Sequence, residues 1–266
     1  MPRILLAALG SEPGLLPPVR SAVTRAMKHH HARPPGPLAP RKCDTVPSAL
    51  WATEDVPTLL DHILLGCSDL DHGIAFVEQH TGARAAFGGV HPGRGTRNAL
   101  LSLGERCYFE IIAPDPKQKD VSLPPVPVED LRKLDTPRLF VWAAQTRDLD
   151  TRARQLGEAG IAFADPSAGS RSRPDGRTLR WRFLFLADDR RGTLPFLIEW
   201  GAGSIHPSAD APGGCRLESL VVSGPDPAGL SKILGLMGVD VRVEKSEQPG
   251  LRACIVGPKG KLEMSS

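Results

Sequence analysis

The sequence predicts an α+β fold built from tandem βαβββ modules, with a partial third module behind them. Three observations lead to this prediction. From residue 60 onward, apolar runs of strand length and amphipathic stretches follow one another in an order that repeats. Two of the amphipathic stretches begin with Asp-Leu-Asp and end at a glycine, as helices often do. The first 50 residues have no such pattern and contain nine of the 26 prolines.

The first module covers residues 58–117. A largely apolar run at 60–67 has the length of a strand. Asp69 then caps a helix that ends at Gly82 and places apolar side chains on one face. Three further strands are expected, at 83–89, 98–104 and 107–114, and the glycine-rich turn His-Pro-Gly-Arg-Gly-Thr separates the first two.

The second module covers residues 137–201 and repeats this order. We expect a strand at 138–146, a helix at 148–160, a strand at 161–168, a loop at 169–176, and strands at 179–188 and 194–200. The two modules form one domain at 56–205, and a partial third module at 214–266 packs on it. This third copy has room for a helix and about three strands. It either completes a sheet edge or mediates a homodimer, since exposed edges need cover.

Residues 1–55 form a Pro/Arg-rich extension that we expect to be disordered, because prolines interrupt every apolar period. Its role stays open between a dispensable tail and an organelle transit peptide, which is typically Arg-rich and acid-poor. The expected location is therefore cytoplasmic, with organelle import as the alternative.

Bulk composition excludes several classes of protein. The net charge of +3 and the 5% of aromatic residues argue against a nucleic-acid partner, which needs a basic patch and stacking platforms. No apolar run reaches the roughly 18 residues that a membrane span requires. Five scattered cysteines without CxxC spacing are typical of reduced thiols rather than of a disulfide framework or zinc cluster.

Five stretches of the sequence resemble the motifs of one protein family. They are Asp61-His62 at the start of the first strand, SDLDHGIAFVEQHTG (68–82), HPGRGTRNALLSLG (91–104), YFEIIAPDP (108–116) and PFLIEWGAGSIHPS (195–208). Over about residues 60–266 the chain resembles the glyoxalase-like domain proteins of the vicinal oxygen chelate superfamily. The resemblance implies a half-open barrel of paired modules around a cavity for a small-molecule ligand. It also implies a lyase, isomerase or oxygenase acting on a small carbonyl or vicinal-oxygen substrate.

The resemblance implies a metal site on the first and last strands of each module. The matching positions are His62 and Glu110 in the first module and Glu199 in the second, while Val141 stands where a fourth ligand would be. We therefore expect His62, Glu110 and Glu199 to hold a divalent metal such as Zn, Mn, Fe or Ni. The metal would polarise substrate oxygens, and Glu199, more than Glu110, would serve as general base.

Substrate-binding residues are expected around the glycine-rich turn. His91 opens this turn, Arg94 and Arg97 offer fork-like donors for a carboxylate or phosphate, and Asn98 offers an amide to a carbonyl. Trp142 is included as a wall of the cavity, with core packing as the alternative.

Simpler interpretations stay open. His62 is also typical of a structural histidine in a strand, whose ring nitrogens have hydrogen-bond partners within the protein. Glu110 could be buried as an ion pair with Arg97 or Arg106. Valine at position 141 cannot bind a metal. This missing fourth ligand favours a different class of protein, one that binds or sequesters a small molecule without metal and without turnover. Convergence of the three predicted ligands to within about 2–3 Å of one point would support a metal.

Overall fold

The computed structural model of the chain describes residues 59–119, 121, 126–173 and 175–266. The predicted extension at 1–55 lies outside the described residues. The elements of the first module are β1 (Leu59–Gly66), α1 (Leu70–Thr81), β2 (Ala86–His91), β3 (Thr96–Gly104) and β4 (Cys107–Pro114). After the short helix α2 (Val128–Arg132), the second module comprises β5 (Arg138–Gln145), α3 (Leu149–Glu158), β6 (Ser167–Ser172), β7 (Thr178–Leu184) and β8 (Phe196–Trp200). A 3₁₀ turn (Pro207–Ala209) leads into β9 (Arg216–Gly224), α4 (Pro227–Leu236), β10 (Arg242–Lys245), β11 (Gly250–Val256) and β12 (Lys261–Ser265).

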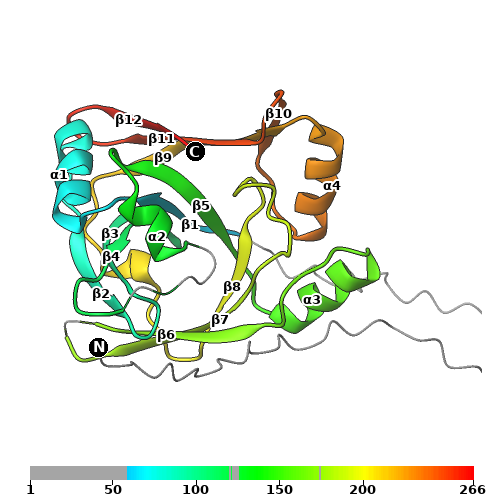
Figure 1. Cartoon of the computed structure of the whole chain (residues 1–266), viewed down its shortest axis with the longest axis horizontal. Helices are drawn as coiled ribbons and strands as arrows, with labels where there is room; N and C mark the ends of the chain where they lie inside the picture. Colours follow the sequence, from blue (N-terminus) through cyan, green and yellow to red (C-terminus); the bar gives the residue numbers. More distant parts are fainter. Residues whose placement is uncertain (1–58, 120, 122–125, 174) are drawn as a thin grey trace, which may run out of the picture. The chain divides into compact units, whose positions relative to one another are not determined.

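The two modules close into an eight-stranded barrel in the order β1-β4-β3-β2-β6-β7-β8-β5, as Figure 1 shows. In each module the first strand lies parallel to the last, and β1 and β5 join the modules side by side in antiparallel orientation. The opposite seam is much weaker, because a single pair, Val90 with Ser172, joins β2 to β6. The predicted α+β fold of paired βαβββ modules is confirmed.

Local signals fix the helices where the sequence predicts them. The Asp69 side chain accepts a hydrogen bond from the backbone N–H of His72 at 2.9 Å, which caps the start of α1. Gly82 ends this helix with a φ of 77°, in the left-handed region that favours glycine. Asp148 caps α3 in the same way through the N–H of Thr151. These caps fix where each helix starts.

Two details of the predicted strands are wrong. The strand expected at 161–168 lies instead at Ser167–Ser172, inside the stretch predicted as a loop. This strand has no apolar alternation, because small residues leave room for the large side chains of β7: a Cβ on Gly169 would lie 2.4 Å from the Trp181 ring nitrogen. The third module also has four strands instead of about three, in the order β10-β9-β11-β12.

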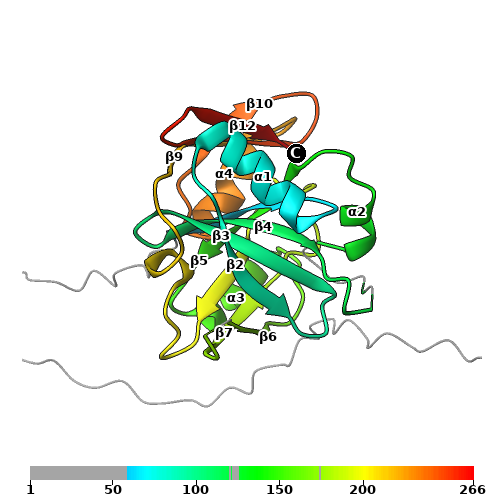
Figure 2. The same cartoon turned by 90° about the vertical axis from the view of Figure 1, so that its left-hand side faces the viewer.

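The C-terminal sheet and the barrel share one hydrophobic core. Helix α1 contacts β3 and β4 of the barrel on one side and β12 on the other, and Figure 2 shows it between the two sheets. Side chains of both sheets, such as Ile63 and Val222, belong to the same buried cluster. The covered faces leave few apolar side chains exposed: among the described residues, the large ones are Phe87 and Ile205.

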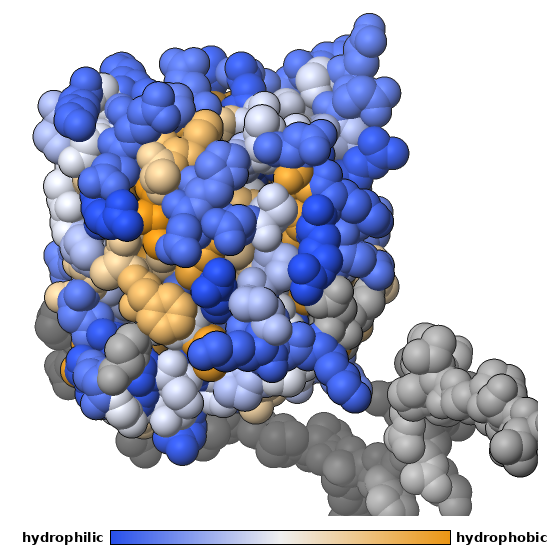
Figure 3. Space-filling model, turned by 60° about the vertical axis from the view of Figure 1, so that its left-hand side comes forward, coloured by the Kyte–Doolittle hydropathy of each residue, from blue (hydrophilic) through white to orange (hydrophobic). Residues whose placement is uncertain are grey.

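The view in Figure 3 shows a mostly hydrophilic surface, with hydrophobic residues visible between charged ones over one region of the face. In the described part of the chain, no helix has the length and apolar character needed to cross a membrane.

Candidate functional site

A cavity of about 80 Å³ lies inside the barrel. One side of its wall is polar and comes mainly from the first module, whereas the other side is apolar and comes mainly from the second. The polar residues are His62, His91, Arg94, Thr96, Asn98, Tyr108, Glu110 and Arg171. The apolar and aromatic residues are Leu64, Ile112, Val126, Trp181, Phe183, Phe185, Phe196, Ile198 and Trp200.

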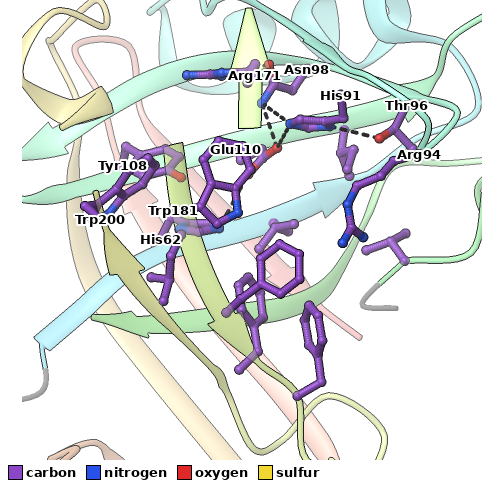
Figure 4. A pocket seen from close by; sticks show the side chains of 17 residues that line it. His62, His91, Arg94, Thr96, Asn98, Tyr108, Glu110, Arg171, Trp181 and Trp200 are labelled. Carbon is purple, nitrogen blue, oxygen red and sulfur yellow. Dashed lines mark hydrogen bonds and ion pairs between the residues drawn. The ribbon is translucent and has the colours of Figure 1, made fainter. Parts of the chain in front are cut away.

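Glu110 is the carboxylate of this wall, buried in the middle of β4. Its Oε1 accepts a hydrogen bond from the Asn98 side-chain amide at 2.7 Å. Its Oε2 lies 3.4 Å from His62 Nε2. The predicted ion pairs with Arg97 or Arg106 do not form among the described contacts: Arg97 lies 4.0 Å from Asp69, and Arg106 donates to Gln145. Glu110 is therefore held by an amide and an imidazole, at the surface of a cavity (Figure 4).

His62 stands between two carboxylates. Its Nδ1 lies 2.6 Å from Asp61 Oδ1, and its Nε2 faces Glu110. The second oxygen of Asp61 lies 2.8 Å from Trp200 Nε1 and 3.0 Å from His206 Nε2. Burial alone would raise the pKa of Asp61, but the hydrogen bonds from His206 and His62 outweigh it and lower this pKa to about 2. An ionised Asp61 accepts the N–H of His62 Nδ1, so Nε2 is the ring nitrogen that faces Glu110.

Asn98 and His91 form a second hydrogen-bonded chain beside Glu110. Arg171 donates to Asn98 Oδ1 at 3.0 Å, and because a guanidinium only donates, this contact fixes the amide with its NH₂ toward Glu110. The same NH₂ lies 3.3 Å from His91 Nε2, and His91 Nδ1 lies 2.9 Å from Thr96 Oγ1. This arrangement suits a neutral His91 with its hydrogen on Nδ1.

The electrostatics agree with that assignment. Burial lowers the pKa of His91 to about 4, and the nearby charges of Arg171 and Arg94 add to the effect while Glu110 opposes it. Burial, with the charges of Asp61 and Glu110, raises the pKa of Tyr108 well above its usual value. At neutral pH the cavity therefore contains a neutral imidazole and a protonated phenol, which are both hydrogen-bonding groups without charge.

The two modules differ at matched positions. The register pairs His62 with Ala143 and Leu64 with Val141 across β1 and β5, which makes Val141 the counterpart of His62. Leu64 pairs with Glu110 in the first module, and the counterpart of Leu64, Ala143, pairs with Phe196 in the second. Phe196, not Glu199, therefore mirrors Glu110.

Glu199 lies on the other face of β8. Strand alternation directs Phe196, Ile198 and Trp200 into the cavity, which all three line, and turns Glu199 away from it. The Glu199 carboxylate lies 3.2 Å from Arg182 Nη1 and accepts a weak hydrogen bond from the N–H of Leu149. The structure thus brings together His62 and Glu110, but not Glu199, of the three predicted metal ligands.

The predicted substrate-binding residues also separate into two groups. His91, Arg94 and Asn98 line the cavity, and the Arg94 guanidinium lies 4.6 Å from the centre of the Phe183 ring. Arg97 does not line it. Trp142 is fully buried in the core on the outer side of the barrel, and its ring N–H donates to the carbonyl of Thr193.

Sequence reasoning missed several residues of the site. Tyr108 could have been found, because it precedes Glu110 by two positions and so shares its face of β4. Arg171 and Phe196 were assigned no role. The contacts of Asp61 with His206 and of Arg171 with Asn98 join residues more than 70 positions apart, and no local pattern signals them.

The donor set does not fit the metal site that the family resemblance implies. Members of the superfamily often use divalent metals, but here Val141 and Phe196 replace two of the four ligand positions. In the described part of the chain, no group of three or more His, Cys, Asp or Glu side chains is arranged to hold an ion. We therefore assign no chemical step to a metal.

The chain is similar to a known protein family and to several solved structures. A family model described as a glyoxalase-like domain matches residues 60–235. A search of curated proteins finds no match. A hypothetical protein from Staphylococcus aureus is similar in structure, with 14% identity, a TM-score of 0.50 and coverage of 78% of this chain and 85% of its own.

Two epimerase structures match less of the chain. Methylmalonyl-CoA epimerase from Mycobacterium tuberculosis is 23% identical, covers 57% of this chain and 91% of its own, and gives a TM-score of 0.39. A variant of the Streptomyces coelicolor methylmalonyl-CoA epimerase in complex with 2-nitronate-propionyl-CoA is 22% identical, covers 57% and 99%, and gives a TM-score of 0.41. Identities this low carry no activity over to this chain.

Proposed function

Because the chain belongs to the glyoxalase-like domain family of the vicinal oxygen chelate superfamily, we propose that it is an isomerase or lyase that moves a proton next to a carbonyl group. The substrate is a small molecule bound inside the barrel, and Glu110 is the general base. One observation carries the proposal: the Glu110 side chain lines the cavity, and its Oε2 lies 3.4 Å from His62 Nε2, with Asp61 behind the imidazole.

The first step follows from what each neighbour of Glu110 does. Asn98 holds Oε1 through a hydrogen bond at 2.7 Å, and Oε2 lies on the side of His62. Oε2 takes a proton from the substrate carbon next to the carbonyl. The electron pair of the broken C–H bond moves onto the carbonyl oxygen and forms an enolate.

The enolate oxygen then needs hydrogen-bond donors. Tyr108, whose pKa is raised well above its usual value by burial and by nearby carboxylates, keeps its proton and offers one donor from the cavity wall. The guanidinium of Arg171 offers more. Return of the proton to carbon, from Glu110 or through His62, gives the isomer, and loss of a leaving group from the enolate would give a lyase reaction instead.

A second function, binding without turnover, rests on the other half of the cavity. Val141 and Phe196 make the second module's matched positions apolar, and five further apolar or aromatic side chains of β7, β8 and the position after β7 line the cavity: Trp181, Phe183, Phe185, Ile198 and Trp200. A protein that only sequesters a small apolar molecule would need this wall. It would not need the neighbouring side chains of Asp61, His62 and Glu110.

Hydrogen–deuterium exchange decides between them. The protein is incubated in D₂O with a panel of three- to five-carbon ketones, hydroxyketones, aldehydes and 2-oxo acids, and loss of the α-proton signal is followed by proton NMR against a protein-free blank. We expect protein-dependent exchange in at least one compound and a fall of at least ~100-fold in Glu110→Gln, the scale of general-base catalysis.

Glu263→Gln is the matched control, because Glu263 is an exposed glutamate on β12. It should exchange like the wild type. Exchange that survives Glu110→Gln, or no exchange with any compound of the panel, would contradict the proposed proton transfer.

A further inference from the structure

Arg171 is a buried cation that no sequence pattern predicts. It comes from β6 of the second module, is 3% exposed, and reaches the cavity wall next to Asn98 and Glu110 of the first module. Burying a guanidinium is costly unless it finds negative charge or enough acceptors. The question is what balances it.

The chain makes room for this side chain at the expense of strand stability. A Cβ on Gly88 of β2 would lie 2.6 Å from Arg171 Nη1, and a Cβ on Gly89 would lie 2.4 Å from the backbone oxygen of Ser172. Two consecutive glycines weaken a strand, because they cost conformational entropy and supply no side chain to pack. Here they let β6 approach β2 closely enough for Arg171 to cross the seam into the cavity.

The protein itself gives Arg171 few partners. Over the described residues, the hydrogen bond that the structure shows for its guanidinium is the one to Asn98 Oδ1, and no carboxylate lies within 4.0 Å of it. A guanidinium has five N–H donors in a planar fork that matches a carboxylate. Most of this fork is therefore unused in a group that lines a cavity.

The charged residues of the cavity wall also leave Arg171 without a carboxylate partner. Two guanidinium groups, Arg94 and Arg171, line the cavity together with one carboxylate, Glu110. Asp61 is ionised but faces His62, His206 and Trp200 behind the wall. Glu110 is held by Asn98 and faces His62, so among the described lining residues no carboxylate lies within 4.0 Å of the Arg171 guanidinium.

We propose that the cavity binds a small carboxylic acid, whose carboxylate pairs with the free donors of Arg171. This inference deepens the proposed function and rests on its assignment of the cavity as the substrate site. Asn98 bridges Arg171 and Glu110, so the carboxylate and the reacting carbon are separated by about the width of one carboxamide group. The substrate class is then short oxo acids.

The test compares charged ligands with neutral analogues of the same shape. Trp181 and Trp200 line the cavity, so intrinsic fluorescence reports binding. Propionate, butyrate and pentanoate are titrated against propionamide, butyramide and pentanamide into the wild type, Arg171→Gln and Arg154→Gln. Arg154 lies exposed on α3 and is the matched control.

We expect the wild type and Arg154→Gln to bind each acid at least ~10-fold more tightly than its amide, in the range of charge-assisted hydrogen bonds. Arg171→Gln should lose this preference. If Arg171 only positions Asn98, the variant would weaken acids and amides alike and keep the preference, which would overturn the proposal. Equal binding of acids and amides by the wild type, or no binding of either, would overturn it too, whether or not Arg171→Gln folds.

The outcome separates this inference from the proposed function. Preferential acid binding without proton exchange in any compound would defeat the proton transfer and leave the carboxylate site standing. Proton exchange in neutral carbonyl compounds, without a preference for binding acids, would support the proton transfer and defeat the carboxylate site.

Discussion

The two halves of the barrel are built alike and lined differently. In each module the first strand lies parallel to the last, and a capped helix follows the first strand. At matched positions the first module has His62 and Glu110, whereas the second has Val141 and Phe196. The duplicated scaffold keeps its inward positions, but only one copy retains groups that can move a proton. The other copy supplies an apolar wall.

The two modules also differ in the hydrogen-bond partners that they offer to the residues at these positions. Asp61 holds the ring of His62, and Asn98 holds Glu110, so each polar side chain of the first module has its own support. Val141 is preceded by Phe140, which offers no hydrogen bond. A polar residue placed at Val141 would therefore lack the partners that make burial tolerable at His62.

The largest effect should come from putting a charge into the apolar half. Val141→Asp keeps nearly the same volume but buries a carboxylate among Leu64, Phe196 and Ile198. We expect the free energy of unfolding to fall by about 3 kcal/mol or more, measured by urea denaturation. Val141→Ala, which only removes methyl groups, should cost about 1–2 kcal/mol. Equal losses in the two variants would show that the halves do not differ in polarity.

An intermediate effect is expected from pH in the polar half. The pKa of His91 is lowered from 6.5 to about 4 by burial. Between these values the unfolded chain binds a proton that the folded protein does not, so stability is complete above pH 6.5 and falls as the pH drops toward 4. From pH 7.5 to pH 5, His91 should remove roughly 2 kcal/mol of stability.

The check is the slope of unfolding free energy against pH in the wild type and in His91→Gln. The variant should be flatter by that amount across this interval, whatever its absolute stability. Identical slopes would mean that His91 titrates normally in the folded protein.

The smallest effect is expected at Glu199, outside the cavity. Its partner Arg182 has a side chain that is 41% exposed, and surface ion pairs of this kind contribute less than about 1 kcal/mol. Glu199→Gln should therefore change the free energy of unfolding by less than about 1 kcal/mol in urea denaturation. A loss as large as that of Val141→Asp would mean that Glu199 is buried in the protein as it exists in solution.

The fold was largely predictable, because its signals are local. The helices that follow Asp69 and Asp148 carry their own start residues, and strands with an apolar face show in the sequence as alternating or apolar runs. Strand β6 was missed, since its inward residue Arg171 is charged and its neighbours are small. Alternation is a signal of apolar packing, whereas β6 places Arg171 beside the polar side of the cavity.

The site was predictable only on one side. His62, Glu110, His91 and Asn98 meet because neighbouring strands of one module bring them together. Glu199 was predicted as a ligand because it was matched to Glu110 on the last strand of its module, but the strand register makes Phe196 the counterpart and turns Glu199 to the other face. The contribution of Arg171 depends on closure of the barrel between β2 and β6, and this closure rests on a single strand pair that no sequence pattern marks.

The most direct test of the difference between the halves is one exchange experiment on two glutamates. Deuterium incorporation into the best compound of the carbonyl panel is measured for the wild type, Glu110→Gln and Glu199→Gln under identical conditions. The account predicts a loss of at least ~100-fold in Glu110→Gln and a rate within about twofold of the wild type in Glu199→Gln. A comparable loss in Glu199→Gln, or full activity in Glu110→Gln, would contradict it.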